Sequence, residues 1–241
     1  MENWFVFNNI SSKELGVYLL EPPTRTIPKI RANTIENDFM DGTKVEMRGV
    51  SSFDITLKIG FHSKKANEEA IYQWLLTGQT GKLSFSDDLE RYYEVYLLDQ
   101  IEFTQKGRFY KTATIKFLAQ PFKKYVNESM IDIGAKGSFY VVNTGNYFCE
   151  PKIQMTGTGI FHWYINGVKI CTIDFGGTER TLVMDSQAKE CTLEDGTLAN
   201  RSMIGGFITF PVGTNNIELR VPTDSTYHIG SINIWMNTRW L

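Results

Sequence analysis

The sequence predicts a mainly β protein of two domains, residues 1–125 and 126–241. Short segments with a two-residue hydrophobic period recur along the whole chain, whereas one segment alone has a helical period. Composition also changes near residue 125: the first part holds 17 basic and 16 acidic residues and 7 glycines, the second 8 basic and 11 acidic residues, 13 glycines and all three cysteines. Residues 119–127, which turn basic and polar after Pro121, are the expected linker.

Strands are expected first in residues 1–125. Between Phe53 and Ile59 apolar residues alternate with polar ones, the pattern of a strand with one face in a core and the other in water. Residues 92–98 and 108–118 are rich in aromatic and β-branched residues, and Gly107 supplies a turn before the second of them. These three segments predict the centre of the first sheet.

A single helix is expected between the strand at residues 53–59 and the strand at residues 92–98. Ser63 is the expected N-cap, and Glu68 and Glu69 lie near the positive end of the helix. Three apolar residues fall on one face of it: Ile71, Trp74 and Leu75. Gly78 is expected to end the helix in a left-handed conformation.

Residues 27–49 show no such period and predict a long loop. Pro28, Asn33 and Asn37 interrupt the pattern, and the apolar pair Phe39-Met40 stands alone within it. A loop of this length is usually functional or disordered.

The second domain predicts a β-sandwich, because short strands are separated by Gly and Asn turns. Asn166-Gly167 predicts a two-residue hairpin turn, since a type I′ turn needs positive φ at both positions. The strands are expected at residues 138–142, 152–156, 161–165, 168–174, 207–210, 217–221 and 229–236.

Overall charge and cysteine usage exclude several classes of protein. The chain carries 25 Lys and Arg against 27 Asp and Glu, so it lacks the basic surface that nucleic-acid binding or an anionic membrane would require. No apolar run approaches the ~20 residues of a membrane span, and the acidic start does not predict a secretory signal. Cys149, Cys171 and Cys191 show no C-x-x-C spacing, so we expect reduced, buried thiols and no metal site.

Enzymatic chemistry has little support in the sequence. Residues 78–82 resemble a phosphate-binding loop only superficially, because two residues separate the glycines and a helix precedes them. His62, His162 and His228 are each isolated, and no catalytic motif surrounds them. We therefore expect no enzyme, catalytic residue or cofactor, while a hydrolase with a scattered triad is the least favoured alternative.

A second alternative is a carbohydrate-binding module that contacts host cell-wall glycan. Aromatic residues of the second domain could stack on sugar rings, and Tyr164 and Trp235 are the weak candidates. Alternation places Trp163 with Phe161 on the inner face of its strand and Tyr164 on the outer face. The position of Trp235 is ambiguous, and burial in the core is the simpler interpretation for either aromatic.

A series of short motifs runs in order along nearly the whole chain: Phe7-Asn8-Asn9, residues 12–16, Trp74-Leu75 with Gly78, Gly81, Lys82 and Leu83, then Asp87-Asp88, Tyr92-Tyr93, Pro121-Phe122, residues 143–146, Gly157-Thr158-Gly159, Phe210 with Gly213, Asn215 and Ile217, and residues 235–241. Their order and spacing resemble the distal tail protein family of long-tailed, siphovirus-type bacteriophages that infect Gram-positive bacteria. One departure is that the family's Gly-Arg-Asp-Gly-like turn is replaced by residues 37–42, of which only Asp41-Gly42 fits.

The resemblance implies a structural virion protein at the distal end of a phage tail, assembled in the host cytoplasm. The first domain would form a hexameric ring that continues the tail tube, and the second would be a galectin-like β-sandwich. As a hub, such a protein joins the tube to the baseplate or tail tip. Its implied partners are the tail tube protein, a tail-associated fibre or lysin and, in some members, a receptor-binding protein.

The residues agree with two features of this resemblance. DNA would pass through the ring without being gripped, and residues 1–125 have a formal net charge of only +1. The segment 27–49 suits an arm that reaches the next subunit, as a heterologous, ring-closing interface requires. Its candidate interface residues are Phe39, Met40 and Arg48; the alternative is that Phe39 packs on its own domain.

Overall fold

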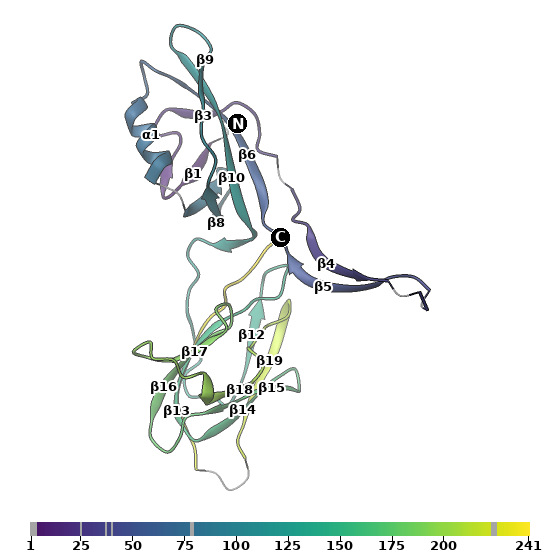
Figure 1. Cartoon of the computed structure of the whole chain (residues 1–241). Helices are drawn as coiled ribbons and strands as arrows, with labels where there is room; N and C mark the ends of the chain where they lie inside the picture. The colour runs from purple at the N-terminus through teal and green to yellow at the C-terminus, as the bar shows by residue number, and fades with distance from the viewer. Residues whose placement is uncertain (1–3, 25, 37, 40, 78–79, 223–225) are drawn as a thin grey trace. The chain divides into compact units, whose positions relative to one another are not determined.

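The computed structural model of the chain describes residues 4–24, 26–36, 38–39, 41–77, 80–222 and 226–241. It divides into two compact units, Met1–Val126 with Leu241, and Asn127–Trp240. Both units are built mainly from antiparallel strands, and α1 (Glu68–Thr77) is the one α-helix among the described residues (Figure 1). The expectation of a mainly β fold with one helix is confirmed.

The first unit contains one large sheet and a separate hairpin. The sheet has the order β2-β1-β7-β8-β10-β6-β3, with β9 paired to β10, and the hairpin is formed by β4 and β5. The strands of this unit are β1 Phe5–Phe7, β2 Ile10–Ser11, β3 Val17–Leu19, β4 Ile30–Ile35, β5 Lys44–Val50, β6 Phe53–His62, β7 Thr80–Phe85, β8 Asp88–Leu97, β9 Phe103–Gln105 and β10 Tyr110–Tyr125.

The core of the first unit lies between the sheet and α1. On β6 the side chains of Ile55, Leu57 and Ile59 are buried and alternate with exposed polar ones, as the sequence predicts. The predicted helical face is also confirmed, because Ile71, Trp74 and Leu75 are all buried. The indole of Trp74 packs against the rings of Phe5 and Phe7, and its Nε1 donates a hydrogen bond to the Phe7 carbonyl at 2.9 Å.

The helix cap differs from the expectation. The Asn67 side-chain oxygen accepts a hydrogen bond from the Ala70 amide at 3.3 Å, which is the N-cap geometry. Ser63 lies four residues earlier, and its hydroxyl instead donates to the Phe109 carbonyl at 3.2 Å. Asn and Ser are equally good caps, so the sequence alone could not separate the two positions. The expected helix stop at Gly78 lies outside the described residues.

The expected linker at residues 119–127 is wrong for most of its length, because the strand expected at residues 108–118 continues as β10 through Pro121 to Tyr125. The pairing of β10 with β8 shifts register between Ala119 and Lys123, and Pro121 lies inside this irregularity. A bulge tolerates proline because the interrupted ladder does not need its missing N–H group.

The expected loop at residues 27–49 is also wrong, because most of it forms the β4–β5 hairpin. A register shift between Arg31 and Ala32 breaks the two-residue period that would otherwise reveal the strands. Gly49 sits at this bulge with φ of +119°, a conformation that favours glycine.

The second unit is a β-sandwich of two five-stranded sheets, in the orders β11-β20-β13-β16-β17 and β12-β19-β14-β15-β18. The predicted sandwich is therefore confirmed as an architecture. Its strands are β11 Ile131–Asp132, β12 Ser138–Asn143, β13 Lys152–Thr158, β14 Ile160–Ile165, β15 Val168–Asp174, β16 Arg180–Asp185, β17 Glu190–Leu193, β18 Met203–Gly205, β19 Gly213–Arg220 and β20 His228–Trp235, with a 3-10 turn at Asn200–Ser202.

Local predictions in this unit mostly hold. Asn166 and Gly167 have φ of 51° and 82°, as the predicted type I′ turn requires. Residues 207–210 do not form a strand, because their ladder pairing is limited to an isolated bridge between Cys149 and Phe210. The sequence did not indicate β11, β16, β17 or β18.

Candidate functional site

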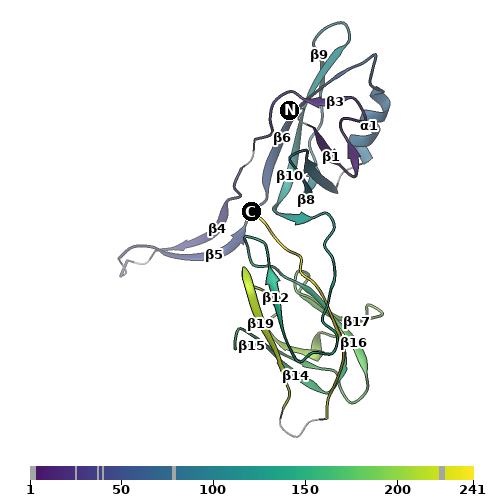
Figure 2. The ribbon, with the colours of Figure 1, turned by 180° about the vertical axis from the view of Figure 1, so that it is seen from behind.

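The β4–β5 hairpin, here called the arm, projects away from the sheet of the first unit (Figures 1 and 2). All six residues of β4 are exposed, and most of β5 is exposed as well. A two-stranded ribbon without packing on either face is marginally stable in water at best. An additional partner for the arm is therefore expected on physical grounds.

The register divides the arm into two chemically different faces. Residues directly opposite each other in an antiparallel pair point to the same side, and the side alternates along each strand. The pairs Ile30–Val50, Ala32–Met47 and Thr34–Val45 consequently share one face, which we call the apolar face. Ile30, Val45 and Met47 on this face are 56%, 52% and 69% exposed.

The opposite face of the arm is mainly polar, although it also carries Ile35, which lies opposite Lys44 and is 43% exposed. Glu46 accepts ion pairs from Lys44 at 3.4 Å and from Arg48 at 3.2 Å. In the amide orientation that satisfies both groups, the Asn33 side-chain oxygen accepts from Nε and Nη2 of Arg48 at 3.1 Å. Arg48 therefore belongs to a network within the arm, and it contributes charge to the polar face.

Two of the three candidate interface residues, Phe39 and Arg48, lie among the described residues, and they occupy different parts of the arm. Phe39 lies beyond the end of β4 at the tip of the arm and is 98% exposed, so it does not pack in the core of its own domain. Arg48 lies on β5, on the polar face, and Met40 lies outside the described residues. The sequence-based candidates lie in the segment that forms the arm, but they do not include Met47 and Val45, whose alternation with Lys44, Glu46 and Arg48 is visible in the sequence.

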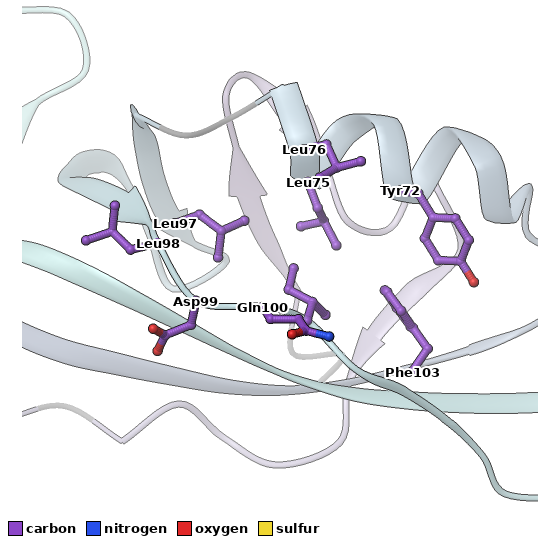
Figure 3. Close-up of a pocket in the computed structure, with 9 residues that line it drawn as sticks. Tyr72, Leu75, Leu76, Leu97, Leu98, Asp99, Gln100 and Phe103 are labelled. Atoms are coloured by element: carbon purple, nitrogen blue, oxygen red, sulfur yellow. The ribbon is translucent and has the colours of Figure 1, made fainter.

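An apolar groove lies on the first unit beside α1, with a volume of about 640 Å³ (Figure 3). One wall is the C-terminal half of α1 and the other is the connection from β8 to β9. Its apolar lining is formed by Tyr72, Leu75, Leu76, Leu97, Leu98, Ile101 and Phe103. Leu76 and Leu98 are 76% and 69% exposed, an unusual degree for leucine side chains that border the same hollow.

Two further grooves of the first unit have a different character. One, of about 530 Å³, is lined mainly by charged and hydroxyl-bearing residues, including Lys58, Glu102 and Lys106. The other, of about 480 Å³, includes Asn8, Lys82 and Glu94. The groove beside α1 is therefore distinguished by its apolar lining.

The two weak glycan candidates lie in different sheets of the sandwich. Tyr164 is on the outer side of β14, and the guanidinium of Arg220 lies 4.2 Å from the centre of its ring. Trp235 ends β20 in the other sheet, where its neighbours Ile234 and Met236 are buried. The two aromatics consequently do not form one stacking platform, and a role for either alone remains a prediction.

Burial shapes the chemistry of the three cysteines and of His162. Cys149, Cys171 and Cys191 are free and buried, and burial raises the pKa of Cys149 and Cys171 to about 12. Burial also lowers the pKa of His162, whose Nδ1 lies 3.0 Å from the Thr172 hydroxyl. Within the described ranges there is no group of three His, Cys, Asp or Glu side chains that could hold a metal ion. In the same part of the chain, none of the helices has the length and apolar character of a membrane span.

Comparison with known proteins identifies the first unit. Residues 10–119 match the family model described as the phage tail protein RIFT-related domain. The matched residues lie within the first unit, which therefore resembles a domain of phage tail proteins. No curated protein sequence matches the chain.

Solved structures extend the likeness to the whole chain. The crystal structure of Dit from phage SPP1, described as a paradigm of the hub adsorption apparatus in phages that infect Gram-positive bacteria, matches with a TM-score of 0.72 at 13% identity over 100% of both chains. Two structures of the phage p2 baseplate in its activated conformation, with Sr and with Ca, match at 9% identity with TM-scores of 0.43 and 0.44, over 96% and 97% of this chain and 97% and 98% of theirs. The resemblance to the distal tail protein family is confirmed by the family match in the first unit and by the fold of the whole chain.

Proposed function

We propose that this protein is the distal tail hub of a phage, a structural virion component that forms a hexameric ring between the tail tube and the baseplate or tail tip. The observation that carries the proposal is the arm, whose apolar face is exposed on a phage tail domain. An exposed apolar face of this kind marks a surface for association. Its work is geometric, and no bond-making step is assigned to it.

Ring closure is supported by the shape of the first unit. The arm projects from one side of the sheet, while α1 lies on the other side (Figures 1 and 2). When a protruding element and its receiving surface occupy different sides of one subunit, the contact is heterologous and repeats from copy to copy. A suitable rotation between copies closes such a chain into a ring.

Passage of DNA through the ring is supported by charge. Residues 1–125 have a formal net charge of +1, too small for the phosphate contacts that hold DNA tightly. On the polar face of the arm, Glu46 offsets part of the charge of Lys44 and Arg48. DNA would be transiting cargo rather than a bound ligand.

The proposed partners follow from the likeness to the SPP1 hub protein. They are the tail tube protein on one side of the ring, a tail-associated fibre or lysin on the other and, in some assemblies, a receptor-binding protein. The proposed location is the distal end of the tail in the virion, after assembly in the host cytoplasm.

The test is the oligomeric state of the purified full-length protein. Sedimentation velocity at high micromolar concentration should give a hexamer, and negative-stain electron microscopy should show rings with an open centre. If rings form only on a tail partner, mixing with the tail tube protein should produce them. A species that stays monomeric in both experiments contradicts the proposal.

A further inference from the structure

We infer that the outer face of strands β12, β19 and β14 in the second unit is a binding site for a neutral oligosaccharide. This is a function beyond the proposed hub, and it does not depend on ring formation. The surface, which we call the β19 face, combines an exposed aromatic side chain of β12 with a polar network on β19. Its members are Tyr140, Asn216, Glu218 and Arg220.

The register of the sheet places these side chains on one side. Residues directly opposite each other in an antiparallel ladder point to the same side. Asn216 lies opposite Tyr140 of β12. Glu218 lies opposite the small residue Ser138 of β12 and, across the other ladder, opposite Tyr164 of β14. Buried residues alternate with these positions along β12, so the β19 face points away from the core of the sandwich.

An exposed apolar strip runs along β12. Tyr140 is 70% exposed, and Val142, two residues further along the same side, is 52% exposed. Folding of the second unit therefore leaves the ring of Tyr140 in water. An aromatic ring in this position can stack on the C–H face of a sugar ring and remove apolar surface from water on both sides.

A polar network runs beside this strip along β19. Oε2 of Glu218 accepts hydrogen bonds from Nε and Nη2 of Arg220 at 3.1 and 2.7 Å, and Oε1 accepts one from Nδ2 of Asn216 at 3.2 Å. The guanidinium of Arg220 also lies 4.2 Å from the centre of the Tyr164 ring, which holds it over the sheet. An ionised carboxylate accepts about four hydrogen bonds, and a guanidinium carries a fork of several N–H donors. Glu218 and Arg220 can therefore accept from and donate to neighbouring hydroxyl groups of one ligand.

The apolar strip and the polar network together select the chemical class of the ligand. Neighbouring strands lie about 4.8 Å apart, so one sugar ring can contact β12 and β19 at the same time. A pyranose has an apolar C–H face and hydroxyl groups at its edge, which match the two strips. Glu218 and Arg220 offset each other's charge, so their pair does not favour an anionic polymer. A protein partner would need a larger group of apolar anchors than Tyr140 and Val142 provide.

The experiment is isothermal titration calorimetry of the full-length protein with maltohexaose, cellohexaose, chitohexaose and lactose. These neutral probes present glucose, N-acetylglucosamine and galactose, and at least one of them should bind with a Kd of about 1 mM or lower. Tyr140→Ala should weaken this binding at least tenfold, whereas Tyr140→Phe should retain it because the ring is kept. Glu218→Gln should also weaken binding at least tenfold, because it removes the charged partner of Arg220.

The matched control is Trp235→Ala. Trp235 lies between the buried residues Ile234 and Met236, on the outer side of the other sheet and opposite Lys152 of β13. Its replacement removes an aromatic side chain of the same unit without changing the β19 face. The affinity for the sugar should therefore stay the same.

The outcomes separate this inference from the proposed function. Weaker binding in Tyr140→Ala and Glu218→Gln, with unchanged binding in Trp235→Ala, supports the β19 face. If none of the four probes binds, or if binding is lost in Trp235→Ala and kept in Tyr140→Ala, the inference is overturned. Ring formation should be the same in the wild type and in every variant, so an absence of rings in all of them contradicts the proposed hub alone.

A second variant keeps the test decisive if Tyr140→Ala does not fold, which circular dichroism checks. Ser138 is exposed and lies opposite Glu218, so Ser138→Leu places a bulky side chain beside the carboxylate while every group of the β19 face is kept. It then replaces Tyr140→Ala and should weaken binding at least tenfold. Binding that persists in Ser138→Leu contradicts the assigned site.

Discussion

The β4–β5 arm and the β14–β15 hairpin are both antiparallel pairs with apolar residues on one face and a register shift within the pair. The apolar face of one is buried and that of the other is exposed. In β14–β15, Phe161, Trp163 and Ile173 lie on one face and are completely buried in the core of the sandwich. In the arm, Ile30, Val45 and Met47 lie on one face and are more than half exposed. The β14–β15 hairpin packs against an opposing sheet in its own unit, whereas the arm has no such sheet among the described residues.

The difference indicates what each ribbon contributes. An apolar face that is covered within its own unit stabilises the fold, since the free energy of burial is gained whenever the chain folds. An apolar face that folding leaves exposed gains this free energy only when another surface covers it. The β14–β15 hairpin is therefore a folding element, and under the proposed function the arm is an association element.

The largest effect is expected for Trp163→Ala. Its indole is completely buried and packs edge-on against the ring of Phe139, with 6.2 Å between the ring centres. Truncation of the side chain therefore leaves a large cavity. We expect a loss of about 3–5 kcal/mol in the free energy of unfolding of the second unit. Urea unfolding followed by circular dichroism measures it. Tyr164→Ala, one position away on the outer face, is the control and should cost less than half as much.

Met47→Asp should affect association and leave the stability of the single chain nearly unchanged. The unfolding free energy of the single chain should change by less than about 0.5 kcal/mol, because Met47 is exposed. Association should weaken roughly a hundredfold, since a charge would have to enter an apolar contact. Sedimentation equilibrium measures this, with Glu46→Gln on the polar face as the control. A Met47→Asp protein that unfolds easily yet still forms rings would reverse the roles assigned to the two hairpins.

The same comparison explains how much the sequence could predict. Those sandwich strands that the sequence indicates, such as β14, place alternate residues in a shared core, as the pattern around Trp163 shows. The arm was interpreted as a loop because its bulge shifts the alternation and because exposed strands tolerate polar residues such as Asn33 on one face. Local patterns record burial within the chain, so they are weakest where a surface is completed by another molecule.

Contacts between distant segments were also beyond the sequence. The groove lies between α1 and the β8–β9 connection, and no local pattern around Leu98 indicates that it lines the same groove as Leu76. The helix cap shows the same limit at short range, since Ser63 and Asn67 are equivalent as residue types and the fold selects Asn67. By contrast, the buried face with Trp74 was predictable, because helical periodicity alone defines it.

Charged groups extend the comparison, and Asp88→Asn should have the next largest effect. Asp88 pairs with Lys123 at 2.8 Å and with Arg91 at 3.0 Å in a partly buried site, whereas the ion pairs of the arm are exposed. Burial opposes ionisation of Asp88, but the hydrogen bonds from Lys123 and Arg91 outweigh it and lower the pKa of its carboxyl. We expect Asp88→Asn to cost about 1–2 kcal/mol at pH 7.

The effect of Asp88→Asn on stability should depend on pH, and the lowered pKa of Asp88 sets the direction of this dependence. A lowered pKa means that the stabilisation is present above the unfolded-state value of about 3.9 and is lost as the pH falls through the folded-state value. The difference between wild type and Asp88→Asn should therefore shrink as the pH falls from about 5 towards about 2. Denaturant unfolding of the wild type and of Asp88→Asn across this range measures it. A constant difference at every pH would mean that packing, and not charge, is responsible.

The smallest effect is expected at the helix cap that positions one wall of the groove. Asn67→Ala removes the hydrogen bond to the Ala70 amide and should cost about 1 kcal/mol in the free energy of unfolding. Fraying of the first turn of α1 should also accelerate hydrogen exchange in residues 68–71, while the last turn, which carries Leu76, should be less affected. Ser63→Ala is the control, since its hydroxyl contacts Phe109 and not the helix amides. If Ser63→Ala accelerates exchange in the first turn more than Asn67→Ala does, the cap assignment is wrong.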